Sequence, residues 1–238
     1  MDSDFLMTGT IIIAGYGPGI SHGIALKFGK ERGYKVALLA RTKSRLELAV
    51  NDLKSLGIHA SGYEVDLADT KAVVTTIETV QKELGDISIL FWNGGGYPKA
   101  ALDASSEDIH TNFTINIDSL IFSIKTLQKE LERNKGAVLV TGGALGIQSE
   151  AAAQLAVDWG ATTYALNKAA QQKLVHILHI TLKPVGIFVG EVTVMTAVKG
   201  TTFDPEGKSD LTVEAVADAF ADLLDKREVP IVRIPAAQ

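Results

Sequence analysis

The sequence contains no cysteine among its 238 residues. This absence excludes disulfide bonds, thiolate catalysis and cysteine-ligated zinc, and it makes a cytoplasmic location the simplest expectation. No charge-free apolar run approaches the about 20 residues that a membrane-spanning helix needs, so we expect no membrane association. The first residues, Met1-Asp-Ser-Asp4, are acidic rather than basic, which is not typical of a secretory signal.

Positive charge is also scarce, since 23 Lys and Arg stand against 28 Asp and Glu, for a net charge of −5. Nucleic-acid binders usually carry a basic face, so we expect no nucleic-acid partner. The five histidines form no recognised metal-binding set, and His176 and His179 lack the H-E-x-x-H context. We therefore expect no metal site.

Apolar runs alternate with helical patterns from one end of the chain to the other. Strands are expected over 10–14, 36–40, 58–65, 87–91, 137–140, 186–190 and 230–234. Helices are expected over 21–32, 46–56, 70–84, 107–133, 159–182 and 211–225, with Asp69 and Ser106 as N-caps. Such alternation predicts an α/β fold, a single-domain doubly wound parallel sheet (Rossmann-like) with helices on both faces, over residues 1–238. Residues 144–157 show no clear pattern, and 197–210 are expected to form a mobile loop.

A glycine-dense turn follows the first expected strand, with glycines at positions 15, 17 and 19. Glycine lets the backbone adopt a positive φ and lets a ligand approach closely, and a helix start favours a phosphate. The turn therefore indicates a dinucleotide site. The alternative is a purely structural turn that packs a helix closely on a strand.

Tyr164 and Lys168 are spaced four residues apart in an expected helix, so they share one helix face. A free phenol has a pKa of about 10, and a nearby ammonium lowers it. The pair is suited to general acid–base chemistry near neutral pH. The alternative is a surface tyrosine whose ring packs on the lysine stem.

The combination of these motifs in this order resembles the short-chain dehydrogenase/reductase family, from about Gly9 to Ile234. The turn is similar to the family's T-G-x-x-x-G-I-G, with Ala14 in place of Thr and Ser21 in place of the last glycine. The resemblance implies cofactor contacts from the turn, from the ends of the third and fourth strands, and from the loop after the sixth. These residues are Gly15, Gly17, Pro18, Gly19, Ile20, Ser21, Asp66, Leu67, Asn93, Gly94, Gly95 and Val192.

The choice of cofactor can be argued from charge at the end of the second strand. An acid there would bond the ribose 2′-hydroxyl of NAD. This chain has Ala40 and then Arg41, with Lys43 and Arg45 close by. A guanidinium suits a 2′-phosphate through paired charge-assisted bonds, so we expect NADP(H). The alternative is a solvated basic helix start.

The resemblance implies hydride transfer between nicotinamide and a carbonyl or alcohol carbon of a small substrate. Tyr164 would exchange the proton, Lys168 would bind the ribose and lower the pKa of Tyr164, and Asn116 would hold a water-linked proton relay. It also implies a homodimer or homotetramer built on the long helices.

One position departs from the family pattern, because Gly143 stands where the catalytic serine usually closes the fifth strand. That serine steadies the developing oxyanion. Ser149 or Thr141 is expected to substitute. The departure keeps a second hypothesis open, a catalytically weak or silent NADP-binding relative with a sensing or partner-binding role.

Overall fold

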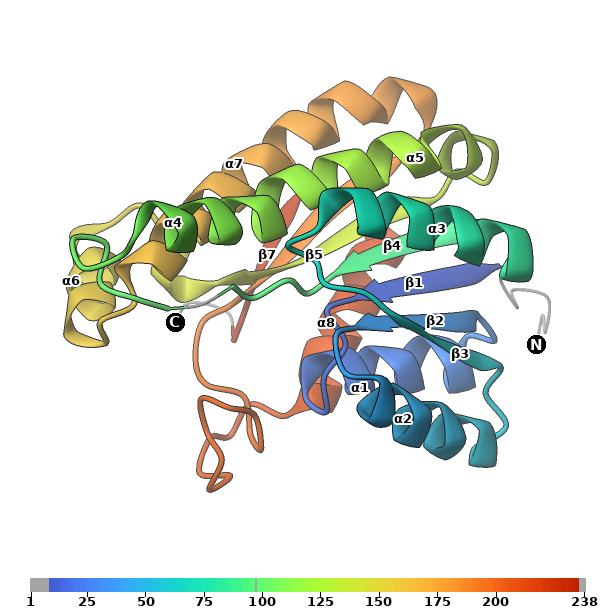
Figure 1. Cartoon of the computed structure of the whole chain (residues 1–238), viewed down its shortest axis with the longest axis horizontal. Coiled ribbons are helices and arrows are strands. Elements are labelled where there is room, and N and C mark those ends of the chain that lie inside the picture. Colours follow the sequence, from blue (N-terminus) through green and yellow to red (C-terminus); the bar gives the residue numbers. More distant parts are fainter. Residues whose placement is uncertain (1–8, 97, 236–238) are drawn as a thin grey trace.

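The structure, a computed structural model, describes residues 9–96 and 98–235; the acidic start of the chain lies outside these residues. The described strands all run parallel in one sheet of order β3-β2-β1-β4-β5-β6-β7 (Figure 1). The strands are β1 (Thr10–Ala14), β2 (Lys35–Ala40), β3 (Ala60–Glu64), β4 (Ile87–Trp92), β5 (Ala137–Gly143), β6 (Phe188–Val194) and β7 (Ile231–Ile234). The predicted fold class is confirmed.

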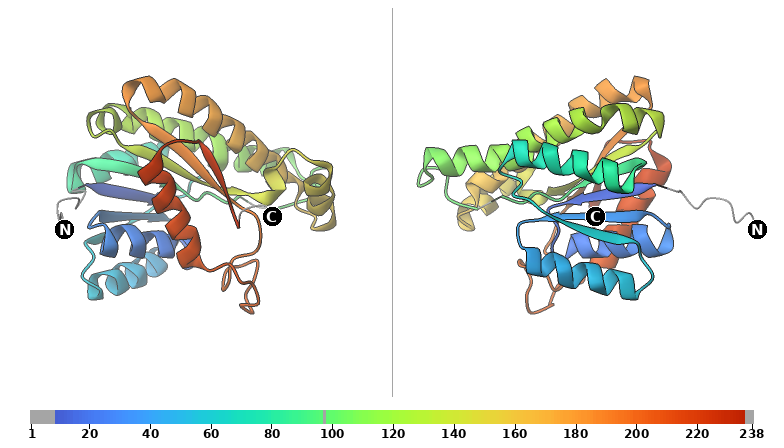
Figure 2. Two further views of the ribbon diagram at one scale, coloured as in Figure 1. Left: turned by 180° about the vertical axis from the view of Figure 1, so that it is seen from behind. Right: turned by 45° about the vertical axis from the view of Figure 1, so that its right-hand side comes forward.

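Helices cover both faces of the sheet. Helices α3, α5 and α7 lie on one face and α1, α2 and α8 on the other (Figures 1 and 2). In the described part of the chain, no helix has the length and apolar character needed to cross a membrane. The helices are α1 (Ile20–Leu26), α2 (Lys43–Ser55), α3 (Thr70–Leu84), α4 (Ser106–Phe113), α5 (Ser119–Arg133), α6 (Glu150–Asp158), α7 (Thr162–Leu182) and α8 (Val213–Lys226).

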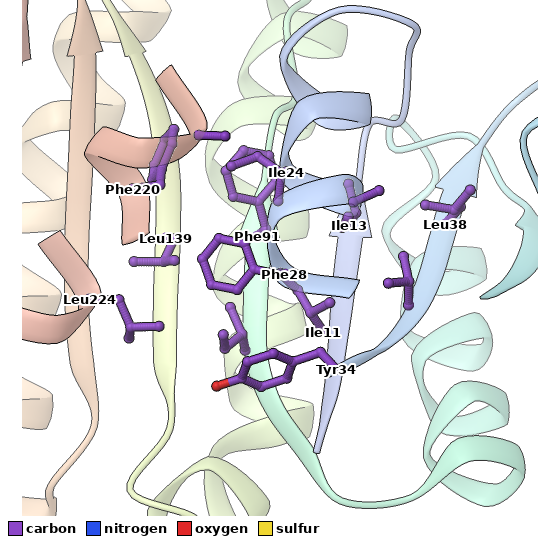
Figure 3. Close-up of a cluster of buried hydrophobic side chains, with 14 of the residues drawn as sticks. Ile11, Ile13, Ile24, Phe28, Tyr34, Leu38, Phe91, Leu139, Phe220 and Leu224 are labelled. Carbon is purple, nitrogen blue, oxygen red and sulfur yellow. The ribbon is translucent and has the colours of Figure 1, made fainter. Parts of the chain in front are cut away.

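Successive residues of β1 are apolar because the strand lies at the centre of the sheet and contributes to a core on each face. Ile11 and Ile13 join the core under α1, α2 and α8, whereas Ile12 joins the core under α3, α5 and α7. Successive side chains point to opposite faces, and both faces are covered here. In the first core, the Phe91 ring meets Phe220 of α8 edge-on, with ring centroids 4.9 Å apart (Figure 3).

The strand order reverses between β1 and β4. The chain leaves β1 towards β2 and β3 and then returns to place β4 on the other side of β1. Ligands of doubly wound sheets bind outside the carboxyl ends of the strands at this reversal. The glycine turn that begins at Gly15 and the segment that begins at Asn93 follow these two strands directly.

Several elements differ from the sequence predictions, and three of the differences bear on the site. Strand β6 runs to Val194 rather than ending near Gly190, because the polar Glu191 and Thr193 lie inside the sheet, fully buried. The unassigned stretch 144–157 contains most of α6, an Ala-rich helix, so α7 begins only at Thr162. The expected helix 107–133 is interrupted by a π-helical turn over Thr114–Asp118.

The N-cap of α4 is Ser105 and not Ser106. The Ser105 hydroxyl accepts a bond from the Asp108 N–H, and the Asp108 carboxylate accepts one from the Ser105 N–H. This reciprocal capping box satisfies two backbone donors at the helix start. The predicted cap at Asp69 is confirmed, since its carboxylate accepts a bond from Ala72 N–H.

Ser105→Ala is expected to lower the free energy of unfolding by about 1 kcal/mol, because it removes the cap of α4. Urea unfolding followed by circular dichroism measures this. Ser106→Ala is the matched control, since the exposed Ser106 hydroxyl lies 3.3 Å from the His110 ring nitrogen and is not the N-cap of α4. An equal loss in both variants would contradict the assignment of the cap.

Candidate active site

A cavity of about 400 Å³ opens at the carboxyl ends of β1, β2 and β4. It confirms that the strand ends singled out by the sequence meet at one edge of the sheet. Its lining residues are Gly15, Tyr16, Ala40, Arg41, Val65, Asp66, Leu67, Asn93, Gly94, Gly95, Gly96, Ile115 and Thr202. Seven of these were predicted to contact the cofactor: Gly15, Arg41, Asp66, Leu67, Asn93, Gly94 and Gly95.

The glycine turn is packed tightly against the end of β4. Gly15 has φ +80°, and a Cβ there would lie 2.7 Å from the Asn93 carbonyl oxygen. Gly17 faces open space. Gly19 is the N-cap residue of α1, and a Cβ added there would lie 2.9 Å from the Thr201 side chain. The turn therefore lets the backbone approach a ligand closely, and the 197–210 segment packs on it.

Ser21 braces this turn from inside. Its buried hydroxyl donates to the Gly15 carbonyl at 3.0 Å and accepts from the Asn93 side-chain amide at 2.8 Å. The serine that replaces the family's last glycine thus ties β1 to β4. These two hydrogen bonds account for the serine at position 21 without a ligand contact.

Three predicted contacts lie elsewhere. Pro18 is exposed at the turn, and Ile20 packs against the core under α1 and α8. The predicted placement of Val192 in a loop after the sixth strand is wrong, because Val192 lies fully buried in the middle of β6, in register with Thr141 and Val232. The loop expected after Val189 begins only after Val194.

The basic and acidic groups of the cavity lie at the ends of β2 and β3. Arg41 is exposed beside Ala40 and lines the cavity. Asp66 accepts a bond from Ala68 N–H at 3.0 Å, which fixes the turn after β3. A cation and a hydrogen-bonding carboxylate thus face one end of the cavity.

The first turns of helix α7 are held in place by contacts with two other segments of the chain. Thr162 and Thr163 bond the backbone of Ala101 and Lys99, and a Cβ on Gly146 would lie 2.7 Å from the Lys168 main chain. The glycine therefore allows the turn after β5 to pack directly on α7. This contact sets the positions of Tyr164 and Lys168.

Lys168 is buried, and all three of its ammonium protons have acceptors. It donates to the Thr141 carbonyl at 2.8 Å, the Gly94 carbonyl at 3.1 Å and the Gln171 side-chain oxygen at 2.9 Å. These bonds join the ends of β4 and β5 to α7. Lys168 must exchange one of them before it can bond a ligand hydroxyl.

Gln171 links Lys168 to Asn116. Its amide nitrogen lies 3.4 Å from both the Asn116 carbonyl oxygen and the Asn116 side-chain oxygen. Asn116 sits in the π-helical turn, a distortion that often marks functional positions. The Gln171 side chain therefore lies between Lys168 and Asn116, where the family resemblance implied a water-linked relay. The sequence pattern gave no indication of this role of Gln171.

Tyr164 lies beside Gly143 at the end of β5. A Cβ on Gly143 would lie 3.3 Å from the Tyr164 hydroxyl oxygen, and the Lys168 nitrogen is 5.6 Å from the Tyr164 ring centroid. Desolvation, and secondarily the charge of Glu191, raises the pKa of Tyr164 to about 12. Burial lowers the pKa of Lys168 to about 8, against an opposing effect of Glu191.

The expected lowering of the Tyr164 pKa by Lys168 is therefore not found. Loss of hydration and, secondarily, the charge of Glu191 both disfavour the phenolate. The phenol is protonated at neutral pH in this structure, which is the form that donates a proton.

The two candidate substitutes for the missing serine differ in their surroundings. Ser149 is exposed and caps α6, accepting a bond from Ala152 N–H at 3.2 Å, so it has another role. The Thr141 hydroxyl is buried with no hydrogen-bond partner among the described residues. Neither hydroxyl is held against Tyr164 by any bond in the described structure.

Comparison with known proteins now identifies the family. The sequence model of "short chain dehydrogenase" matches residues 9–206. The chain belongs to the short-chain dehydrogenase family. The match covers the cavity, the glycine turn and the Tyr164–Lys168 pair.

Individual relatives share less than a third of their residues with this short-chain dehydrogenase. Mouse 17-beta-hydroxysteroid dehydrogenase 13 is 29% identical over 139 residues, 58% of this chain and 45% of the relative. NADP-dependent 3-hydroxy acid dehydrogenase of Schizosaccharomyces pombe is 30% identical over 145 residues, 59% of this chain and 56% of the relative. The chain thus matches about half the length of these curated relatives.

A solved structure shows the same fold along almost the whole chain. L-sorbose reductase from Gluconobacter frateurii, complexed with NADPH and L-sorbose, has a TM-score of 0.81. The match covers 97% of each chain at 20% identity. At that identity the likeness concerns the fold.

Proposed function

We propose that this protein is an NADP(H)-dependent oxidoreductase that transfers a hydride between nicotinamide and a carbonyl or alcohol carbon of a small organic substrate. The observation that carries the proposal is the placement of Tyr164, whose hydroxyl lies beside Gly143 and whose ring centroid is 5.6 Å from the buried Lys168 nitrogen. Family membership and the relatives named above support the reaction class.

The residues present fit a dinucleotide. The glycine turn offers close backbone approach at Gly17, and the cavity runs from Arg41 past Asn93 to Gly95. Arg41 would bond the 2′-phosphate, Asp66 and Leu67 would meet the adenine, and the backbone after Asn93 would flank the ribose. When bound, NADPH supplies the hydride.

The chain's own groups manage the proton. Tyr164, protonated at neutral pH, donates its proton to the substrate oxygen as negative charge develops there. Lys168, charged below about pH 8, is the cation that would offset the negative charge left on Tyr164 by this transfer. Gln171 and Asn116 hold the ammonium in place. In the reverse direction Tyr164 must first lose its own proton, and its phenolate would then accept the proton of the alcohol.

Consumption of NADPH with a panel of aldehydes and ketones tests this function. We expect oxidation of NADPH that depends on the carbonyl compound and exceeds that of NADH. A protein that binds NADPH and turns over none of the panel would favour the catalytically silent alternative.

Arg41→Ala is expected to weaken NADPH binding by roughly tenfold to a hundredfold, because a hydrogen bond to a charged group contributes about 1.5–3 kcal/mol. NADH binding should change little, since NADH lacks the 2′-phosphate. Fluorescence titration of both cofactors measures the difference. Lys54→Ala, an exposed cation late in α2, is the matched control. Equal losses for the two cofactors would contradict this role.

We further propose a homodimer or homotetramer built on α4, α5 and α7. Large apolar side chains remain exposed along these helices: Ile109, Phe113, Phe122, Leu166, Ile177 and Ile180. Such a set is typical of an interaction surface. Light scattering after size-exclusion chromatography should give two or four times the mass of 25.3 kDa, and a monomer would refute the assembly.

A further inference from the structure

A carboxylate lies inside the sheet close to the tyrosine–lysine pair. Glu191 of β6 is fully buried. One of its carboxylate oxygens accepts bonds from the Thr193 hydroxyl at 2.6 Å and the Gln172 amide at 2.9 Å. The other oxygen is buried without a hydrogen-bond partner in the described part of the chain. An uncompensated buried charge is costly, so this carboxylate needs an explanation.

The neighbouring strand leaves room for this side chain. A Cβ on Gly142 would lie 2.1 Å from a Glu191 carboxylate oxygen and 2.4 Å from the carboxyl carbon. Any side chain at position 142 would therefore displace the carboxylate. Glycine at 142 and glutamate at 191 form a matched pair across β5 and β6.

The residues on either side of Gly142 in β5 contact the proposed catalytic groups, which brings the carboxylate close to them. Lys168 bonds the carbonyl of Thr141, immediately before Gly142. A Cβ on Gly143, immediately after it, would lie 3.3 Å from the Tyr164 hydroxyl and 3.9 Å from Lys168 Cγ. Gln172, which holds the carboxylate, follows Gln171, which holds the lysine, so both sets of bonds are fixed by one turn of α7.

Lys168 is the buried cation that can balance Glu191. Its three hydrogen-bond acceptors are neutral, so the two charges interact through the protein rather than through a direct bond. Glu191 opposes the effect of burial on the pKa of Lys168 and raises the pKa of Tyr164.

The other titratable groups near β6 are differently engaged. Arg233 of β7, in register with Thr193, is exposed. His179 of α7 contacts the Val189 carbonyl oxygen at 3.0 Å through a ring nitrogen. Tyr164 and Lys168 are therefore the groups on which the carboxylate acts most directly.

We propose that Glu191 is a positioning residue, the buried counter-ion that keeps the Lys168 ammonium charged in a site whose burial disfavours charge. The catalytic consequence rests on the proposed function, whereas the electrostatic pairing does not.

NMR of protein carrying ¹³C-labelled lysine tests the pairing without any cofactor or substrate. The Lys168 Cε resonance, assigned with Lys168→Met, should titrate near pH 8 in the wild type. In Glu191→Gln, which keeps the shape and acceptor oxygen but removes the charge, the midpoint should fall by roughly one pH unit or more. Gln172→Leu, which removes a bond to the carboxylate but keeps its charge, should leave the midpoint close to that of the wild type.

Two results would overturn the proposal. One is a folded Glu191→Gln variant with an unchanged Lys168 midpoint, and the other is an equal shift in Gln172→Leu, which would indicate loosened packing. If Glu191→Gln does not fold, ¹³C-labelled glutamate decides the matter in the wild type, because the Glu191 carboxyl resonance should move through the same midpoint as Lys168. A Glu191 carboxyl resonance that does not change as Lys168 titrates would overturn the pairing.

The activity profile separates this inference from the proposed function. If NADPH-dependent reduction is found, its alkaline limb should move to lower pH in Glu191→Gln, whereas a packing defect would lower activity equally at every pH. If no carbonyl compound is turned over, the proposed function fails and the NMR titration still decides the role of Glu191.

Discussion

Tyr164→Phe should lower turnover of carbonyl substrates by about 10² to 10⁴-fold, the usual contribution of a positioned general acid. The phenylalanine ring keeps the packing on α7 but has no proton to donate beside Gly143. Binding of NADPH, measured by fluorescence, should remain close to that of the wild type, because Tyr164 does not line the cofactor cavity. The loss should therefore appear in kcat.

Tyr63→Phe is the matched control for this substitution. Tyr63 lies on β3 and its hydroxyl donates to Glu83, away from the cavity. We expect turnover in this variant to match the wild type. A Tyr164→Phe protein that retains wild-type turnover would show that another group supplies the proton.

Gly143→Ser should raise carbonyl reduction, by up to about 10²-fold, because an oxyanion donor contributes about 10² to 10³ in kcat where it is well placed. The new Cβ would lie 3.3 Å from the Tyr164 hydroxyl, so the ring must move by a few tenths of an ångström. The serine hydroxyl would then be close to the proton donor and could bond the substrate oxygen. The gain is expected in kcat with the panel substrate that the wild type reduces best.

Gly143→Ala separates the hydroxyl from the added bulk. It carries the same Cβ with no donor, so we expect turnover at or below that of the wild type. If the alanine variant gains as much as the serine variant, the effect is steric. If Gly143→Ser loses activity while Gly143→Ala keeps it, the wild-type site already stabilises the oxyanion in another way.

The fold and one half of the site could be predicted from the sequence because they depend on local patterns. Thr10–Ala14 is buried throughout, and its residues from Ile11 onward are apolar, since both its faces are covered by helices. Arg41, Asp66 and Asn93 each follow a strand, and parallel strands bring their carboxyl ends to one edge. Strand assignment alone therefore placed them around one cavity.

The rest of the site depends on contacts between distant segments. Glu191 and Thr193 are polar, so a strand assignment based on apolar residues ends β6 too early and places Val192 in a loop. In the structure, Gln172 and Gly142 accommodate both polar side chains inside the sheet. Gln171 has no periodic signature, and its role follows only from the approach of the π-helical turn that carries Asn116.

Ser149 shows a second limit of sequence reasoning. A hydroxyl near the expected position of a missing one is a reasonable substitute until the helix that it caps is known. The Ala-rich segment 150–158 carries few charged residues and no clear apolar stripe, so α6 was not recognised. The role of Ser149 as the N-cap of α6 thus accounts for its hydroxyl without a catalytic role.

The most direct test of the central claim follows the hydride itself. Purified protein is given NADPH deuterated at C4 of the nicotinamide on the transferred face, each face being tested in turn, with the carbonyl panel. Mass spectrometry of the alcohol product should show one deuterium on the carbinol carbon for one of the two faces, and Tyr164→Phe should form that product far more slowly. An absence of labelled alcohol with either face, while NADPH is bound or oxidised, would contradict the proposed hydride transfer.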